Sequence, residues 1–149
     1  MPTPAEIAEK FRKIDAHDDT VEGFSFHPAA KRGSKSKVTV TLFRHWEGTR
    51  RVLTLSDCQN LDLVVDSDVL RDNAPNNTAV VEATADASEV EAVMRRHRRA
   101  WNVSYEKTID PMPKKLAIAD RSVLFRVRLF GGNLVVVARS FTIKRLPNT

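Results

Sequence analysis

The sequence predicts an α+β fold, a mainly antiparallel β-sheet or sandwich with one or two packed amphipathic helices. Short segments rich in β-branched and aromatic residues recur with turn residues between them, which indicates about seven or eight strands. Two further segments repeat apolar residues at helical spacing. No repeat or low-complexity tract divides the 149 residues, so we expect a single domain over residues 1–149.

The N-terminal segment predicts a short amphipathic helix that ends near Asp15. The residues Thr3-Pro4-Ala5-Glu6 have the pattern of a capping box with proline at the first helical position. Ile7, Phe11 and Ile14 follow at positions i, i+4 and i+7, which places them on one face of the helix.

Alternating apolar residues then predict five strands before the next helical segment. We expect them over residues 21–27, 37–44, 50–56, 61–65 and 78–84. The loop from Pro28 to Lys37 is basic, and its Gly33-Ser34-Lys35-Ser36 is not a phosphate-binding loop, because a strand follows it where such a loop needs a helix. Residues 102–107 are expected to form another strand after the second helix.

A second helix is expected after residue 85, capped by Asp86 or Ser88, with Glu89 or Glu91 completing a capping box. Its apolar stripe should pack on the sheet. The stripe consists of Val90, Val93, Met94, His97 and Trp101. At the edge of this stripe, His97 is expected to be a partly buried structural histidine.

The opposite surface of this helix carries the arginine cluster Arg95, Arg96, Arg98 and Arg99, the densest charge in the chain. A pair between Glu91 and Arg95 and the helix dipole give the cluster a structural role. Four arginines exceed what a cap needs, and the planar guanidinium suits carboxylate and phosphate groups. The predicted partner-binding residues are Arg95, Arg96, Arg98, Arg99, Lys114 and Lys115.

The longest run of β-branched and aromatic residues, 122–146, contains the only Gly-Gly pair and predicts a hairpin. Its apolar rows are Val123, Phe125, Val127 and Leu129 in the first arm, and Val135, Val137, Phe141 and Ile143 in the second. A three-residue loop, 131–133, would put both rows on the same side. Arg139 would then mark a bulge or the rim of the sheet.

Charge is divided unevenly along the chain. The net charge is +5, but residues 1–89 carry 11 Lys/Arg and 15 Asp/Glu, whereas residues 90–149 carry 13 and 4. Such a division indicates a basic surface for a polyanionic partner, or charges that pair inside one fold or between the two copies of a homodimer.

Several classes of function find no support in the sequence. The single cysteine, Cys58, cannot form an internal disulfide, and the charged N-terminus is unlike a signal peptide, so we expect a cytoplasmic protein with no membrane span and no cofactor. No nucleophile, base and orienting group fall at a recognisable spacing, which favours a non-enzymatic role. The residues His17-Asp18-Asp19 are expected to cap the corner between the first helix and the first strand and to be solvated there. The alternative is that they bind a metal or act as acid and base. Their neighbours supply no further ligands, so we expect no metal.

Four segments carry a resemblance to known proteins: His17 to Val21, Val38 to Leu42, Leu53 to Leu61, and Ala138 to Ile143. Together they resemble small uncharacterised bacterial β-rich proteins, some of which are grouped with the immunity proteins of toxin systems. Those proteins have a His-Asp-Ser corner before a strand meander, and here Asp19 replaces the serine. The resemblance implies an immunity role and no catalytic residue, and the arginine-rich helix is not part of it.

We therefore expect a cytosolic protein-binding module, an immunity or accessory factor, whose basic helix face docks an acidic partner. The alternative is a nucleic-acid-binding protein that uses the same arginines together with Lys31, Arg32, Lys35 and Lys37 as a basic arm. A third hypothesis is a small-ligand site inside the sheet lined by aromatic residues. These are Phe24, Phe26, Trp46 and Trp101, which we expect to belong to the core instead.

Overall fold

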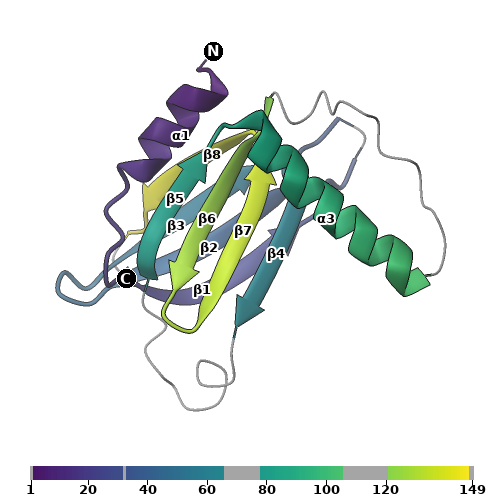
Figure 1. Cartoon of the computed structure of the whole chain (residues 1–149). Helices are drawn as coiled ribbons and strands as arrows, with labels where there is room; N and C mark the ends of the chain where they lie inside the picture. The colour runs from purple at the N-terminus through teal and green to yellow at the C-terminus, as the bar shows by residue number, and fades with distance from the viewer. Residues whose placement is uncertain (1, 32, 66–77, 106–120, 148–149) are drawn as a thin grey trace.

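Two four-stranded antiparallel sheets pack face to face, and two helices, α1 and α3, flank them (Figure 1). The computed structural model describes residues 2–31, 33–65, 78–105 and 121–147, without the side chains of residues 78–80 and 97–105. Within these ranges the predicted α+β fold with a mainly antiparallel sheet is confirmed.

Sheet 1 has the strand order β1-β2-β3-β8. Its strands are β1 (Thr20–His27), β2 (Lys37–Arg44), β3 (Thr49–Ser56) and β8 (Ser140–Arg145). Sheet 2 has the order β4-β7-β6-β5. Its strands are β4 (Asn60–Val65), β5 (Thr78–Thr84), β6 (Val123–Leu129) and β7 (Gly132–Ala138).

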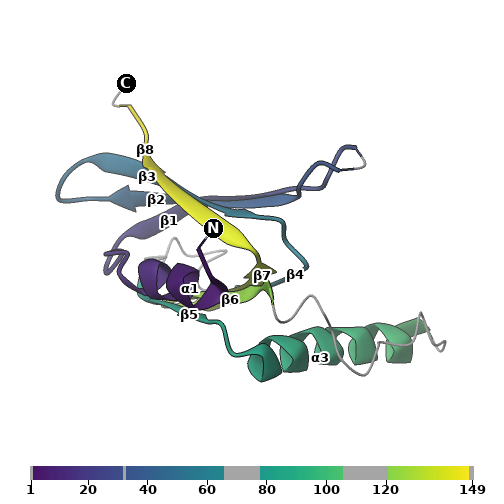
Figure 2. The same ribbon diagram turned by 90° about the horizontal axis from the view of Figure 1, so that it is seen from above.

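The main core lies between the two sheets, which Figure 2 shows from above as two layers. One row of each strand faces this space, because successive side chains of a strand point to opposite sides. Almost completely buried inner residues include Val38, Val40, Leu42, Leu53 and Leu55 of sheet 1 and Val123, Phe125, Val127 and Val136 of sheet 2.

Helix α1 (Pro4–Arg12) closes one side of the core. The predicted capping box is confirmed, since the side chains of Thr3 and Glu6 each accept a hydrogen bond from the other residue's backbone N–H. Phe11 is fully buried, and its ring lies edge-on to Phe125 at a centroid distance of 4.8 Å. The helix ends at Arg12, earlier than the predicted end near Asp15.

The loop between β6 and β7 has two residues, and the predicted three-residue loop is wrong. Leu129 pairs with Gly132, so that only Phe130 and Gly131 connect the strands. This register pairs Phe125 with Val136 on the core side. Val135 and Val137 consequently lie on the opposite side of sheet 2, and the prediction that they share a face with Phe125 is also wrong.

The second arm of the predicted hairpin is two strands in different sheets. β7 ends at Ala138 in sheet 2, and β8 begins at Ser140 in sheet 1, so Arg139 lies at the rim where the chain crosses over. The Arg139 N–H donates to the Ser56 carbonyl, and its guanidinium forms an ion pair with Asp57 at 3.1 Å. Of the two roles predicted for Arg139, the structure shows the rim.

Other local predictions also need correction. Residues 102–105 are helical and not a strand, because α3 (Ala87–Tyr105) continues through them. Phe24, Phe26 and Trp46 are exposed, at 37%, 52% and 60%, and are not part of the core. The Trp46 ring instead lies against the Arg44 guanidinium, 5.2 Å from the ring centroid.

Candidate binding groove

Helix α3 begins directly after β5 because Asp86 caps it. The Asp86 carboxylate accepts hydrogen bonds from the Ser88 hydroxyl at 2.6 Å and from the Ser88 N–H at 2.9 Å. These bonds, that of the hydroxyl above all, lower the pKa of Asp86. The Asp86 N–H donates to the Thr84 hydroxyl, so the bond predicted from this N–H to the Glu89 carboxylate is not the one formed.

The first half of α3 packs on the outer face of sheet 2. A second, smaller hydrophobic cluster lies between the helix and this face. Val90 is fully buried in it, and Ala87, Val93 and Met94 of the helix are partly buried. The sheet contributes Leu124, Val135 and Val137. The predicted packing of the helix on the sheet is therefore confirmed for the described side chains.

The second half of α3 extends beyond β4, the edge strand of sheet 2, in both views of the molecule (Figures 1 and 2). The backbone of Arg98 and Arg99 belongs to this half. A groove lies between the helix and the outer face of sheet 2.

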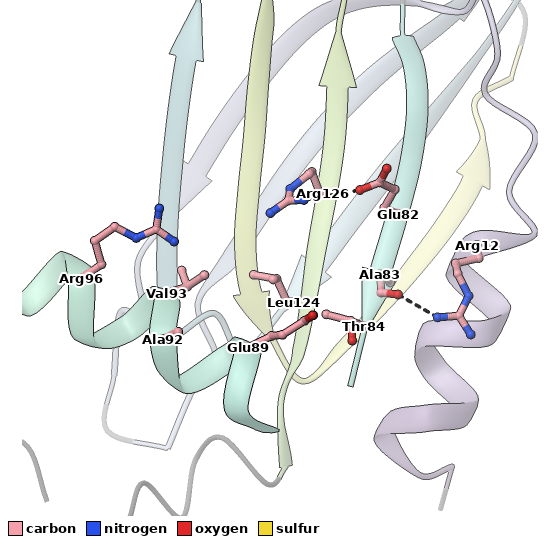
Figure 3. A pocket seen from close by; sticks show the side chains of 10 residues that line it. All are labelled: Arg12, Glu82, Ala83, Thr84, Glu89, Ala92, Val93, Arg96, Leu124 and Arg126. Atoms are coloured by element: carbon pink, nitrogen blue, oxygen red, sulfur yellow. Dashed lines mark hydrogen bonds and ion pairs between the residues drawn. The ribbon is translucent and has the colours of Figure 1, made fainter. Parts of the chain in front are cut away.

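Two adjoining cavities form this groove, which we call the α3 groove. The first, on the β5 side, has a volume of about 550 Å³. Its lining residues, drawn in Figure 3, include Arg12, Glu82, Glu89, Arg96 and Arg126. The second, on the β4 side, has a volume of about 380 Å³. Its lining is Asn60, Asp62, Val93, Arg96, Arg126, Asn133 and Val135.

Arg126 lies at the centre of the groove and lines both cavities. It stands on the outer face of β6, where its cross-strand neighbours are Glu82 and Val135. One of its terminal nitrogens lies 3.5 Å from the Glu82 carboxylate, which is a long ion pair. Its Nε is buried and has no hydrogen-bond partner among the described residues. A buried donor in this condition costs about 1–3 kcal/mol. Because Nε has almost no accessible surface, a group in the cavity does not reach it.

Asn133 lines the β4-side cavity together with Arg126, and it has a buried acceptor without a donor in the described structure. Its side-chain carbonyl oxygen, Oδ1, is buried and accepts no hydrogen bond from the described part of the chain. Both residues line this cavity, but the two unpartnered atoms are themselves inaccessible to solvent.

The arginine cluster predicted from the sequence divides into different roles. Arg95 forms the expected ion pair with Glu91 at 2.6 Å. Arg96 is exposed and has no ion-pair partner among the described residues, and Figure 3 shows its side chain extending toward Arg126. The side chains of Arg98 and Arg99 lie outside the description, as do Lys114 and Lys115 altogether.

The corner His17-Asp18-Asp19 is a structural feature and lies away from the groove. Asp19 is completely buried between Arg44 and Arg51, at 3.1 and 2.5 Å, so the expectation of a solvated carboxylate is wrong for this residue. His17 and Asp18 are exposed and lie 3.4 Å apart. The described residues contain no group of three or more side chains suited to holding a metal ion.

The groove residues that sequence reasoning missed are Arg126, Asn133 and Asp62. A partial signal existed, because alternation in the first arm of the hairpin places Arg126 on the face away from the core. The three-residue loop, however, assigned Val135 to the core face and thereby hid that this outer face has its own apolar patch and its own helix.

Chemically, the α3 groove can hold an anion. Guanidinium groups donate paired, charge-assisted hydrogen bonds to carboxylate or phosphate oxygens, and two of them reach this space from different elements. In the β5-side cavity, Arg12 is already committed to Glu9 and to the Ala83 carbonyl, and its guanidinium lowers the pKa of Glu9. Arg126 is paired with Glu82, though at a long distance, so the free binding capacity lies mainly with Arg96.

Among the described residues, neither helix has an apolar stretch long enough to cross a membrane. Comparison of the chain with models of protein families, with curated proteins and with solved structures gave no match. What the chain does must consequently be inferred from the groove itself.

Proposed function

We propose that the protein is a binding module that docks an acidic segment of a partner protein along α3 and into the α3 groove. The observation that carries this proposal is Arg96, an exposed arginine without an ion-pair partner in the described structure, placed over a groove that also contains Arg126. Arginines in this condition retain their capacity for bidentate bonds to carboxylates.

The pairing of charges inside the fold supports the choice of α3 over other basic regions. Arg128 and Arg139 of the basic C-terminal part form ion pairs with Glu82 and Asp57. These contacts use acidic residues of the first 89 positions, whereas Arg96 retains its charge for a partner. The immunity role implied by the resemblance would make that partner a toxin with an acidic surface.

Nucleic acid is the competing partner. Its basic arm would include Lys31 and Lys35, which belong to the loop between β1 and β2. That loop extends from sheet 1, on the other side of the sandwich from α3 (Figure 2). A single polyanion would have to pass around sheet 2 to contact both regions, so the acidic protein partner is favoured.

The test is a charge reversal of the arginine cluster, Arg95, Arg96, Arg98 and Arg99 to Glu, assayed by fluorescence anisotropy with a labelled Glu- and Asp-rich peptide. We expect the affinity to fall by about tenfold or more, because attractive contacts become repulsive. A matched control reverses four exposed basic residues of sheet 1 and its loop, which changes the net charge equally. These are Lys31, Lys35, Lys37 and Lys144.

Equal losses in the two variants would show that net charge alone governs binding and would contradict the proposal. A DNA or RNA duplex that binds more tightly than the peptide, with an affinity that falls about tenfold or more between 50 and 200 mM salt, would establish the competing function instead.

A further inference from the structure

The side of the sandwich opposite α1 is bounded by two edge strands, β1 of sheet 1 and β4 of sheet 2. Helix α1 packs against β5 and β8, the other two edge strands, and so covers only the far side of the core. In the described part of the chain, neither helix has its main contacts with β1 or β4. This side of the sandwich is thus formed by strand edges and not by a helix.

Three apolar side chains of the core-facing rows are exposed on this side. Leu63 of β4 pairs with the buried Leu134. Phe24 and Phe26 of β1 likewise pair with buried valines of β2. Directly opposite residues of antiparallel strands point to the same face, so all three side chains face the layer between the sheets. Leu63, Phe24 and Phe26 are nevertheless 39%, 37% and 52% exposed, which shows that this layer is open to solvent along β4 and β1.

Strand β4 also has a free edge, since its only strand neighbour among the described residues is β7. An edge strand presents a row of unpaired backbone N–H and C=O groups, to which an extended segment of a partner can add. Helix α3 continues beyond this edge on the outer face of sheet 2 (Figures 1 and 2). A strand added to β4 would therefore have α3 on one face and the open apolar layer on the other.

The two faces of an added strand would meet different chemistry. The part of α3 from Arg96 onward contains three arginines and no Asp or Glu. On the strands below it, the charged groups of the β4-side cavity are Asp62 and Arg126, and Arg126 is paired with Glu82. Acidic side chains are therefore favoured on the face toward α3, except directly opposite Asp62, where like charges destabilise a sheet. Apolar side chains are favoured on the other face, beside Leu63.

We infer that the partner's acidic segment binds by adding to β4 as a further strand of sheet 2. Its side chains alternate, with acidic residues toward α3 and apolar residues toward the layer that Leu63, Phe24 and Phe26 line. This inference rests on the proposed function and deepens it by naming the conformation and the residue pattern of the segment.

The first experiment compares the blocked peptides EVEVEVE and EEVVVEE, which have the same composition and charge. Their affinity for the full chain is measured by fluorescence anisotropy. We expect EVEVEVE to bind about tenfold more tightly, because only its extended form has one acidic face and one apolar face. Equal affinities would contradict the alternating pattern.

N-methylation of EVEVEVE tests the backbone hydrogen bonds. The N–H groups of successive residues in a strand point to opposite edges, so those of either the glutamates or the valines point to β4. We expect methylation of one of these two sets to lower the affinity by about tenfold or more, and methylation of the other set to change it little. Two methylated peptides with the same affinity would show that no strand is added.

The exposed apolar residues are tested in the chain itself with Leu63→Ser. We expect the affinity for EVEVEVE to fall by about fivefold, because apolar surface that binding buries is lost. Leu146→Ser is the matched control, since Leu146 has a similar exposed fraction, 37%, and follows β8 at the other edge of sheet 1. Phe26→Ser, at a more exposed position, keeps the test valid if Leu63→Ser disturbs folding.

Hydrogen exchange of the β4 amides separates strand addition from the proposed function. If reversal of the arginine cluster abolishes binding but neither peptide order nor methylation matters, strand addition is wrong and the function stands. If the neutral peptide QVQVQVQ slows exchange at alternate β4 amides as strongly as EVEVEVE, strand addition stands and the preference for an acidic partner is wrong. Protection of these amides that rises with protein concentration, without peptide, would assign the edge to a second copy and overturn the inference.

Discussion

Asp19 is a buried carboxylate whose ion pairs connect the start of β1 to β2 and β3. Its side chain is completely buried, and it is held by Arg44 and Arg51, whose side chains are only 13% and 21% exposed. Removing one member of a buried ion-pair network leaves charges without compensation. The two arginines lie 25 and 32 residues further along the chain, so local sequence could not predict that they pair with Asp19.

We expect Asp19→Ala to lower the free energy of unfolding by about 3 kcal/mol or more. Urea denaturation monitored by circular dichroism measures this value. His17→Ala is the control from the same corner, and it should change the free energy by less than about 0.5 kcal/mol because His17 is exposed. Similar values for the two variants would contradict the structural role of Asp19.

Asp86 makes the stability of the helix start dependent on pH. The hydrogen bonds from Ser88 lower the pKa of Asp86 in the folded state. The ionised Asp86 carboxylate therefore stabilises the folded state fully when the pH is above the pKa that Asp86 has in the unfolded chain. This stabilisation is lost as the pH falls through the lower pKa that Asp86 has in the folded state. Asp86→Asn keeps an acceptor oxygen but does not titrate.

We therefore expect the stability difference between wild type and Asp86→Asn to be constant above about pH 5 and to shrink below about pH 4. Urea denaturation over this range measures it. A difference that grows as the pH falls has the opposite sign and would show that the carboxylate is not stabilised by folding.

At the scale of elements, the parts that local sequence determines were predictable. The capping box of α1 and the bounds of β2 and β5 agree with the structure. The errors concern features, such as strand register and loop length, that depend on contacts between distant parts of the chain. Gly131-Gly132 suggested a longer loop, but Gly132 is a strand residue that β4 approaches closely, and the resulting register determines which face meets α3.

Gly132 is required by this close approach and not by an unusual backbone angle. A Cβ atom at this position would lie 2.4 Å from the Val64 carbonyl oxygen, so β4 would have to move. We expect Gly132→Ala to lower the free energy of unfolding by about 2 kcal/mol. Gly23→Ala in β1 is the control, since its Cβ would meet the Thr41 hydroxyl at an ordinary 3.9 Å. Thermal and urea unfolding that do not distinguish the two variants would contradict the β4–β7 register.

On the scale of the whole molecule, the uneven charge of the chain is partly resolved by folding. Arginines of the C-terminal part pair with acidic residues of the first part, as Arg128 does with Glu82 and Arg139 with Asp57. The sequence left open whether these charges pair inside the fold or form a basic surface for a partner, and the described residues show internal pairs. Arg96 and the groove beneath it are the part of such a basic surface that the structure describes.

The candidate site was predictable only in part for the same reason. Helical spacing identified Arg96 as a polar residue of the helix but placed it on the surface opposite the apolar stripe. In the structure Arg96 lies beside Val93 of that stripe and lines the groove. Arg126, Asn133 and Asp62 come from three strands, and only the strand order of sheet 2 brings them beneath α3. Neither composition nor motif spacing encodes that arrangement.

The most direct test maps where an acidic peptide binds on the whole molecule. Backbone amide signals of the full chain are followed by nuclear magnetic resonance during titration with a Glu- and Asp-rich peptide. We predict shifts concentrated in α3 and in the strands β4, β6 and β7 that line the groove. Shifts concentrated instead on the outer face of sheet 1 and the β1–β2 loop would contradict the assignment of α3 as the docking surface.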